Sequence, residues 1–201
     1  LPGDAMPHES MDTTHFSVAD KFGNVTSNTY TLNSGFGSGI IVDGTGVLMN
    51  NEMDDFVSAP GIPNQFGLIG GEANKIEPFK RPLSSMTPTI VFQENKPIIA
   101  TGSPGGSRII TAVLQFLLNT LDFKMEISDA TVVPRIHHQW KPDVLMLEKG
   151  FDAGHASTIK ALGQPIYISG PGTSLESLEI KNNLFYGFGG TRRPDSKAKG
   201  L

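Results

Sequence analysis

A pair of threonines, Thr13 and Thr14, stands between a polar leader and a predicted strand. Residues 1–12 hold two prolines, a glycine and three acidic residues without an apolar run, which predicts a mobile segment. Residues 15–20 alternate with a period near two, which predicts a strand. If the chain were cut after Asp12, Thr13 would carry a hydroxyl and a free α-amine, a nucleophile with its own base. The simpler alternative is that both threonines are ordinary β-forming residues at a strand start.

A second candidate for chemistry is the glycine-rich loop 102–107, which precedes a predicted helix. Such a loop presents backbone N–H groups to negative charge. It has neither a Gly-Lys-Ser/Thr ending nor a GxGxxG spacing, so we discount nucleotide binding. The alternative use of these amides is to hold the oxyanion that forms in acyl transfer, and Gly105 and Gly106 are the candidates.

The segment 50–56 (NNEMDDF) places three carboxylates within four residues. Taken alone, such a charge cluster predicts a solvated acidic turn. The segment 59–75 is rich in glycine, proline and asparagine, which predicts a long irregular loop. Loops of this length in compact domains are usually functional or mobile.

The secondary-structure elements that must position these residues are short, and they include both strands and helices. Twenty-three glycines and fourteen prolines in 201 residues predict many turns and short strands rather than a helical protein. Hydrophobic spacing predicts helices and strands in no simple alternation. The strands are expected at 15–20, 25–33, 40–42, 46–49, 90–92, 98–100, 144–147, 166–168 and 184–190, and the helices at 110–121, 127–132 and 152–162. The fold class is therefore α+β.

Composition excludes several classes of partner and site. The net charge of −4 comes without a basic stripe, so we expect no nucleic-acid partner. The absence of cysteine excludes disulfides, thiol catalysis and thiolate metal sites. Adjacent His137 and His138 point to different sides of a strand, so we expect structural histidines, with no metal and no cofactor. No apolar run approaches the roughly twenty residues of a membrane span, and residues 1–12 lack the regions of a signal peptide.

Six blocks of sequence together resemble the small subunit of a γ-glutamyltranspeptidase, also called glutathione hydrolase. They occur in the order of that family and cover most of residues 13–150. The blocks are TTHFSV (13–18), YTLN (30–33), NNEMDDF (50–56), RPLSSMTPT (81–89), GSPGGSR (102–108), and PR (134–135) with HHQW (137–140). The resemblance implies an N-terminal-nucleophile hydrolase with an αββα sandwich, of which this chain supplies roughly half. Residues 1–12 would be the precursor leader and 13–201 the small-subunit catalytic domain.

The resemblance also implies roles for individual residues. The precursor would cut its own backbone between Asp12 and Thr13, and Thr13 would then be the nucleophile. Thr31 would hydrogen-bond and help to activate it, and Gly105 and Gly106 would form the oxyanion hole. The expected substrate-binding residues are Asn33, Glu52 and Asp55 for the α-ammonium of the γ-glutamyl group, and Ser84 and Ser85 for its α-carboxylate.

These residue types suit a zwitterionic substrate. Its ammonium needs acidic partners and its carboxylate needs donors, because an unpaired buried charge costs several kcal/mol. The expected reaction takes glutathione or another γ-glutamyl amide, forms a γ-glutamyl ester on Thr13, and passes the group to water or to the amine of an amino acid or dipeptide. A cephalosporin acylase, which takes a glutaryl group without the α-ammonium, is the alternative enzyme. The acidic pair argues against it. An uncleaved, inactive homologue with a binding role is the alternative from another class.

Two features depart from the family pattern. The family's active enzyme pairs this subunit with a larger one from the same precursor, which supplies an arginine for the substrate carboxylate. In the sequence as it stands, residues 1–12 precede Thr13, so this form would be an unprocessed precursor segment. The tail after Gly190 matches the family poorly. Bacterial relatives imply a periplasmic or secreted enzyme.

Overall fold

The computed structural model describes residues 12–170 and 172–200. The expectations for residues 1–11 of the leader therefore lie outside the described residues. The strands are β1 Thr14–Ala19, β2 Val25–Tyr30, β3 Thr89–Gln93, β4 Lys96–Gly102, β5 Ile136–His137, β6 Leu145–Glu148, β7 Ile166–Ser169, β8 Glu176–Lys181 and β9 Leu184–Gly189. The α-helices are α1 Arg108–Leu117, α2 Ile127–Val132 and α3 Ala153–Ala161, with short helical turns at η1 Glu52–Asp55, η2 Glu72–Asn74 and η3 Leu118–Asp122.

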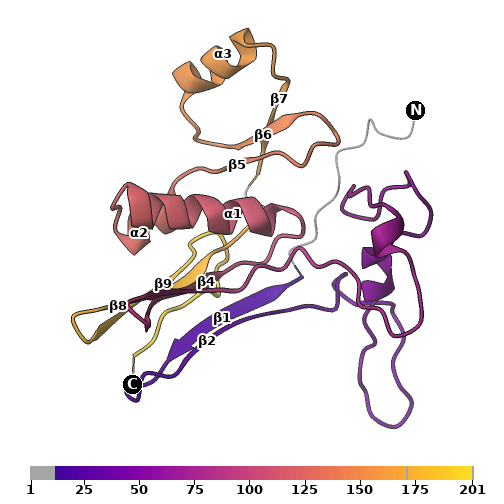
Figure 1. Cartoon of the computed structure of the whole chain (residues 1–201), viewed down its shortest axis with the longest axis horizontal. Helices are drawn as coiled ribbons and strands as arrows, with labels where there is room; N and C mark the ends of the chain where they lie inside the picture. Colours follow the sequence, from indigo (N-terminus) through magenta and orange to yellow (C-terminus); the bar gives the residue numbers. More distant parts are fainter. Residues whose placement is uncertain (1–11, 171, 201) are drawn as a thin grey trace.

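The described residues form three layers. A four-stranded antiparallel sheet in the order β3-β4-β8-β9 lies in the middle. Helices α1 and α2 cover one face, and the β1–β2 hairpin packs on the other through β4 and β8 (Figure 1). A second unit, β5-β6-β7 with α3, extends beyond α1, and the segment between β2 and β3 lies to one side of the layers. The predicted α+β class is confirmed.

The core lies between α1 and the central sheet. Ile109, Val113 and Phe116 of α1 are buried against Ile99 of β4 and Leu175. These helix positions follow the spacing of three and four that brings side chains onto one face. The expected helix is confirmed, although its last turn is η3, which is π-helical.

The predicted buried face of α1 is partly wrong. The spacing of three and four in the sequence predicts a buried stripe at Ile110, Val113, Leu114, Leu117, Leu118 and Leu121. Of these residues, Ile110 and Leu114 are 50% and 53% exposed. The helix is apolar on more than one side, so two stripes satisfy the same spacing and only the sheet selects between them. The second stripe, with Ile110 and Leu114, is exposed.

No helix among residues 12–170 and 172–200 has the length and apolar content to cross a membrane.

Two other expectations need correction. The segments 40–42 and 46–49 do not form strands and share only one bridge, between Ile41 and Leu48. Strand β2 ends at Tyr30 rather than at residue 33, because Asn33 adopts a positive φ of 76°, which extended backbone does not allow.

One central strand was not predicted. β8 has the polar sequence ESLEIK and pairs with β4 on one side and β9 on the other. Its apolar residues are too few to give a period-two signal. The sheet around it decides its conformation.

Phe116 tests the placement of the core. Its side chain is fully buried, whereas Phe123, a few residues later, is 73% exposed. We expect Phe116→Ala to lower the free energy of unfolding by about 3–5 kcal/mol. The same change at Phe123 should cost less than about 1 kcal/mol. Urea unfolding of both variants measures the difference, and equal losses would contradict this core.

Candidate active site

The register of the first hairpin places Thr13 beside Thr31. Thr14 pairs with Tyr30 in the antiparallel ladder, so the next pair outward is Thr13 with Thr31. Opposed residues in such a ladder have Cβ atoms about 5 Å apart. Thr13 is buried at 6% exposure, and the Thr31 hydroxyl oxygen accepts the N–H of Asn33 at 2.8 Å. The two threonines that were expected to act together are therefore neighbours.

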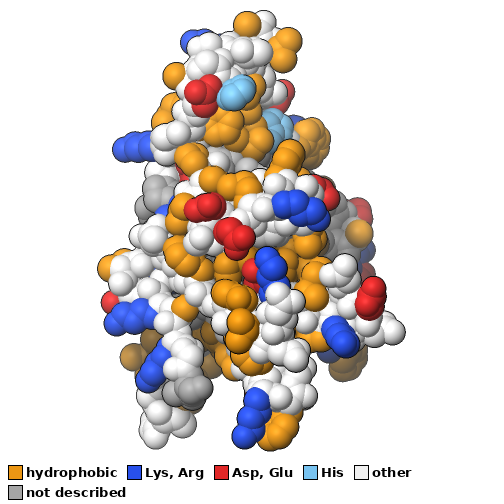
Figure 2. Space-filling view, turned by 90° about the vertical axis from the view of Figure 1, so that its left-hand side faces the viewer, with side chains coloured by type: hydrophobic (Ala, Val, Ile, Leu, Met, Phe, Trp, Pro, Cys, Tyr) orange, Lys and Arg blue, Asp and Glu red, His pale blue; other side chains and the backbone are white. Residues whose placement is uncertain are grey.

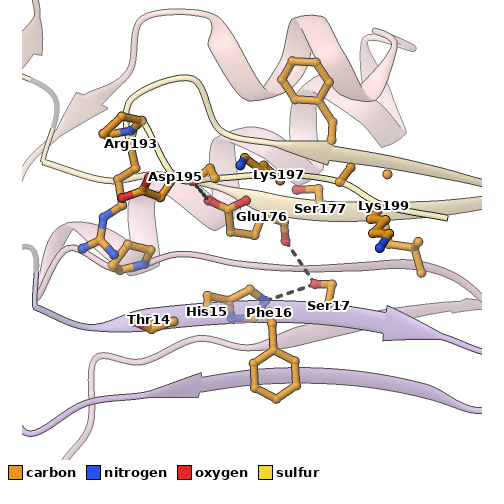
Figure 3. A pocket seen from close by; sticks show the side chains of 17 residues that line it. Thr14, His15, Phe16, Ser17, Glu176, Ser177, Arg193, Asp195, Lys197 and Lys199 are labelled. Atoms are coloured by element: carbon orange, nitrogen blue, oxygen red, sulfur yellow. Dashed lines mark hydrogen bonds between the residues drawn. The ribbon is translucent and has the colours of Figure 1, made fainter. Parts of the chain in front are cut away.

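His15 fixes the strand that carries Thr13. Its Nδ1 lies 2.6 Å from the Thr29 hydroxyl of β2 and its Nε2 lies 3.1 Å from the Ser17 hydroxyl. The Ser17 hydroxyl donates to the backbone carbonyl of Glu176 at the start of β8 (Figure 3). The ring also packs against Gly102, where a side chain would collide with it. Burial lowers the pKa of His15 to about 4, so the ring is neutral at physiological pH.

Asn51 joins the end of β2 to the acidic turn. Its carbonyl accepts the side-chain N–H of Asn33 at 3.3 Å, and its side-chain oxygen accepts the N–H of Ser34 at 2.9 Å. Its own N–H donates to the Leu32 carbonyl at 3.1 Å. Because η1 begins at the next residue, these bonds hold Glu52 close to the end of the hairpin.

Glu52 and Asp55 form an acidic pair on η1. Burial is the main cause that raises both pKa values, and the nearby Asp55 charge adds to the effect on Glu52, whose pKa rises to about 7. The two carboxyls share a hydrogen bond. Oε1 of Glu52 is buried and has no hydrogen-bond partner among the described residues. A pair of carboxyls with an unsatisfied oxygen is suited to a cationic group that donates several hydrogen bonds.

Asn74 sets the distance between the acidic pair and the two serines. Its side-chain amide donates to the Asp55 carbonyl at 2.7 Å, and its side-chain oxygen accepts the N–H of Leu83 at 2.9 Å. Ser84 and Ser85 follow directly. The sequence analysis did not identify Asn74, since one asparagine in a loop full of asparagine and glycine gives no signal of its own.

The glycine-rich loop ends at the N-terminus of α1 in a conformation that requires glycine. Gly105 has φ of 133° and Gly106 has φ of 54°. A Cβ at Gly105 would collide with the carbonyl of Gly172, and one at Gly106 would lie 2.9 Å from the Phe66 ring. Neither N–H donates a hydrogen bond to any described residue. These two amides remain available for an anion.

One small cavity of about 20 Å³ brings most of the predicted site residues together. It is large enough for one water molecule. Gly105 and Asp12 do not line it, although each is next in sequence to a residue that does. The lining residues are Thr13, Thr31, Asn33, Glu52, Asp55, Ser84, Ser85 and Gly106, together with Phe66, Met86 and Ile109, which sequence reasoning did not assign.

A larger cavity of about 780 Å³ separates β1 from the C-terminal tail (Figure 3). The tail residue Ser196 donates to the Glu176 carboxylate at 2.6 Å, so the tail is fastened to β8. Burial lowers the pKa of Arg193, while the charges of Glu176 and Asp12 raise it. Arg193 is therefore close to the residue that precedes Thr13.

The two adjacent histidines have separate structural partners. His137 is buried, with Nδ1 at 2.8 Å from the Thr111 hydroxyl and Nε2 at 2.9 Å from Oε1 of Gln139. His138 lies 3.1 Å from Asp143 near the surface. Within the described part of the chain, no three His, Asp or Glu side chains are grouped as metal ligands.

The three-layer fold matches solved structures of one kind of enzyme, the γ-glutamyltranspeptidases. An acivicin-inhibited γ-glutamyltranspeptidase has a TM-score of 0.87 and 47% identity, covering 90% of this chain and 99% of that chain. The γ-glutamyltranspeptidase from Pseudomonas nitroreducens has a TM-score of 0.86 and 40% identity, covering 94% and 98%.

Sequence comparison gives the same result. The family model Gamma-glutamyltranspeptidase matches residues 3–200, and the chain belongs to that family. The glutathione hydrolase proenzyme of Escherichia coli (strain K12) is 48% identical over 200 residues. This match covers 99% of the present chain and 34% of the relative, so the chain spans about a third of that protein. The family match includes the tail after Gly190, where the resemblance had been poor.

The acidic pair predicts a pH-dependent stability. Glu52 has a pKa of about 7 in the folded chain against about 4.5 when unfolded, so the folded chain binds more protons between these values. Stability should therefore fall as the pH rises through this window. Relative to wild type, Glu52→Gln should gain stability from about pH 5 to about pH 7.5, as measured by urea unfolding. Glu94→Gln, an exposed carboxyl in the β3–β4 turn, is the control. A constant difference between wild type and Glu52→Gln would contradict the shared proton.

Proposed function

We propose that this chain is the catalytic small subunit of an autoprocessing γ-glutamyl hydrolase and transferase. The observation that supports this most strongly is the shared cavity, in which Thr13 lies with the acidic pair, the two serines and Gly106. Family membership and the match to small-subunit-sized chains support the same activity. The substrate would be glutathione or another γ-glutamyl amide.

The first reaction is self-cleavage. The Thr13 hydroxyl attacks the carbonyl carbon of Asp12, and the C–N bond breaks as the amine of Thr13 takes up a proton. Water then hydrolyses the resulting ester, which leaves a carboxylate on Asp12 and a free amine on Thr13. Cleavage turns a buried residue, one position before β1, into a nucleophile that is already held in place by the β1–β2 register.

Substrate binding uses opposite charges at the two ends of the amino-acid group. Glu52 and Asp55 accept hydrogen bonds from the α-ammonium, which satisfies the buried oxygen of Glu52. Ser84 and Ser85 donate to the α-carboxylate, and Asn33 supports the ammonium side. Held at this end, the γ-carbonyl is directed toward Thr13.

Acyl transfer follows in two steps. The Thr13 hydroxyl attacks the γ-carbonyl while the terminal amine, directly or through a water, takes its proton. Thr31 donates a hydrogen bond that orients the nucleophile. The N–H groups of Gly105 and Gly106 stabilise the oxyanion, and the leaving amine departs with the proton. Water or an acceptor amine then attacks the γ-glutamyl ester and frees Thr13.

The partner would be a larger subunit from the same precursor, which completes a four-layer αββα sandwich. The exposed Phe16 and Tyr30, which contact each other on the hairpin, are suited to such a covering layer. Apolar side chains also gather across the middle of the face in Figure 2. The partner would add an arginine for the substrate carboxylate. The enzyme would act in the periplasm or outside the cell.

The tail is a further element of the proposed processing site. For the acivicin-inhibited enzyme, critical roles in autoprocessing and catalysis are described for its C-terminus. In this chain Arg193 is close enough to Asp12 for their charges to interact. We include the tail in the proposed site because it would steady the residue before the cleaved bond.

Cleavage provides the first test of this function. In the full-length precursor we expect wild type and Thr13→Ser to separate into two chains, because both keep a hydroxyl at residue 13. Thr13→Ala should remain one chain and be inactive. Mass spectrometry and N-terminal sequencing detect the new terminus. An intact wild-type chain that still turns over substrate would contradict the mechanism.

Substrate choice provides the second test. Asp55→Asn should raise KM for a γ-glutamyl anilide by about 10- to 100-fold, because one charged hydrogen bond to the ammonium is lost. A glutaryl anilide has no ammonium, so its KM should change little. Asp54→Asn is the matched control, since Asp54 lies on the same turn and bonds the N–H of Gln65 outside the cavity. Equal effects on both anilides, or a wild-type preference for the glutaryl compound, would favour the acylase alternative.

A further inference from the structure

The HHQW segment contains a glutamine whose side chain reaches two parts of the proposed active site. Oε1 of Gln139 accepts the Ser107 hydroxyl at 2.7 Å, and Ser107 directly follows Gly106. Nε2 of Gln139 donates to the carbonyl of Phe66 at 3.1 Å, and the Phe66 ring covers Gly106. The side-chain amide of Gln139 therefore holds two things in place. It holds the glycine loop through Ser107, and it holds Phe66, which packs on Gly106 from the long loop 59–75.

The amide has only one orientation that satisfies its neighbours. Nε2 also donates to the Lys141 carbonyl at 3.1 Å, so the two amide hydrogens face two carbonyl oxygens. Oε1 also lies 2.9 Å from Nε2 of His137, which must donate because Oε1 only accepts. A rotated amide would place oxygen against both carbonyls. All four hydrogen-bonding positions of Gln139 are used, which makes it a rigid link.

His137 holds this link against α1. With a proton on Nε2, its Nδ1 is an acceptor and faces the Thr111 hydroxyl at 2.8 Å. Thr111 lies one turn into the helix whose N-terminus follows the glycine loop. The chain of contacts therefore runs from α1 through His137 and Gln139 back to Ser107, and the loop is braced from outside as well as by its own helix.

We propose that Gln139 is a positioning residue that holds the N–H groups of Gly105 and Gly106 in the direction of the oxyanion. This inference rests on the proposed function. The N–H groups of an oxyanion hole act on charge that develops in the transition state, so their alignment affects kcat more than substrate binding. Gln139 touches neither substrate nor Thr13, and its influence passes through Ser107 and Phe66.

The test compares two glutamines in the full-length, two-subunit enzyme with a γ-glutamyl anilide as substrate. Loss of one oxyanion donor costs about 100- to 1,000-fold in kcat, so misalignment after Gln139→Leu should cost about 10- to 100-fold, with KM within about twofold. Gln115→Leu is the matched control. Gln115 bonds the backbone of Ile136 and Thr111 in the same region and does not reach the loop. It should lower stability while kcat stays within about twofold of wild type.

Two further variants separate positioning from general damage. Gln139→Glu keeps the acceptor oxygen for Ser107, so its kcat should lie above that of Gln139→Leu. The losses of Ser107→Ala and Gln139→Leu should not multiply in the double variant, because they remove the same contact. Rates are measured per cleaved enzyme, so that incomplete maturation does not lower them.

If the wild-type enzyme is active, any one of three results would overturn the inference. The first is that kcat is unchanged in Gln139→Leu, and the second is that kcat falls equally in Gln115→Leu. The third is that the losses of kcat in Ser107→Ala and Gln139→Leu multiply in the double variant. An inactive wild-type enzyme would instead overturn the proposed function itself.

Discussion

The buried contact between His15 and its three neighbouring strands is the constraint on which the site depends. The neutral ring joins β1 to β2 through Thr29, and through Ser17 it joins β1 to β8. Only glycine at residue 102 leaves room for it. A hairpin of two strands is marginal alone, and this contact ties it to the central sheet. The position of Thr13, one residue before β1, follows from that attachment.

The rest of the site is built on loops, and asparagine amides fix those loops. Asn51 connects the end of β2 to the acidic turn, and Asn74 connects that turn to the two serines. Amides suit this task because each offers both donors and acceptors to backbone groups that have no ladder partner. Local hydrogen bonds thus replace regular structure between β2 and β3. The result is a cavity whose charged groups face a nucleophile held by the sheet.

A buried network of charged residues joins the end of α2, β6 and the start of the C-terminal tail. The Glu148 carboxylate accepts the backbone N–H of Arg135 at 3.0 Å and the Arg192 guanidinium at 2.6 Å. Arg192 also donates to the carbonyls of Thr131 at the end of α2 and of Val133 just after it, at 2.8 and 3.0 Å. Burial lowers the pKa of Arg135 to about 10, with a further lowering by Arg192 that Glu148 opposes. These bonds anchor the first residues of the tail, and the residues after Arg192 lie beside β8, β9 and β1.

The sequence by itself determined the class of the fold, the threonine pair at a strand start, the glycine loop before a helix and the acidic turn. These are local patterns, and local propensity and spacing specify them. The family resemblance supplied the site residues that share the cavity. Only the tertiary structure decided which stripe of α1 is buried, that the polar β8 is a central strand, and that Asn74 and Gln139 brace the site. Each depends on partners far away in sequence, whose packing and hydrogen bonds no local pattern encodes.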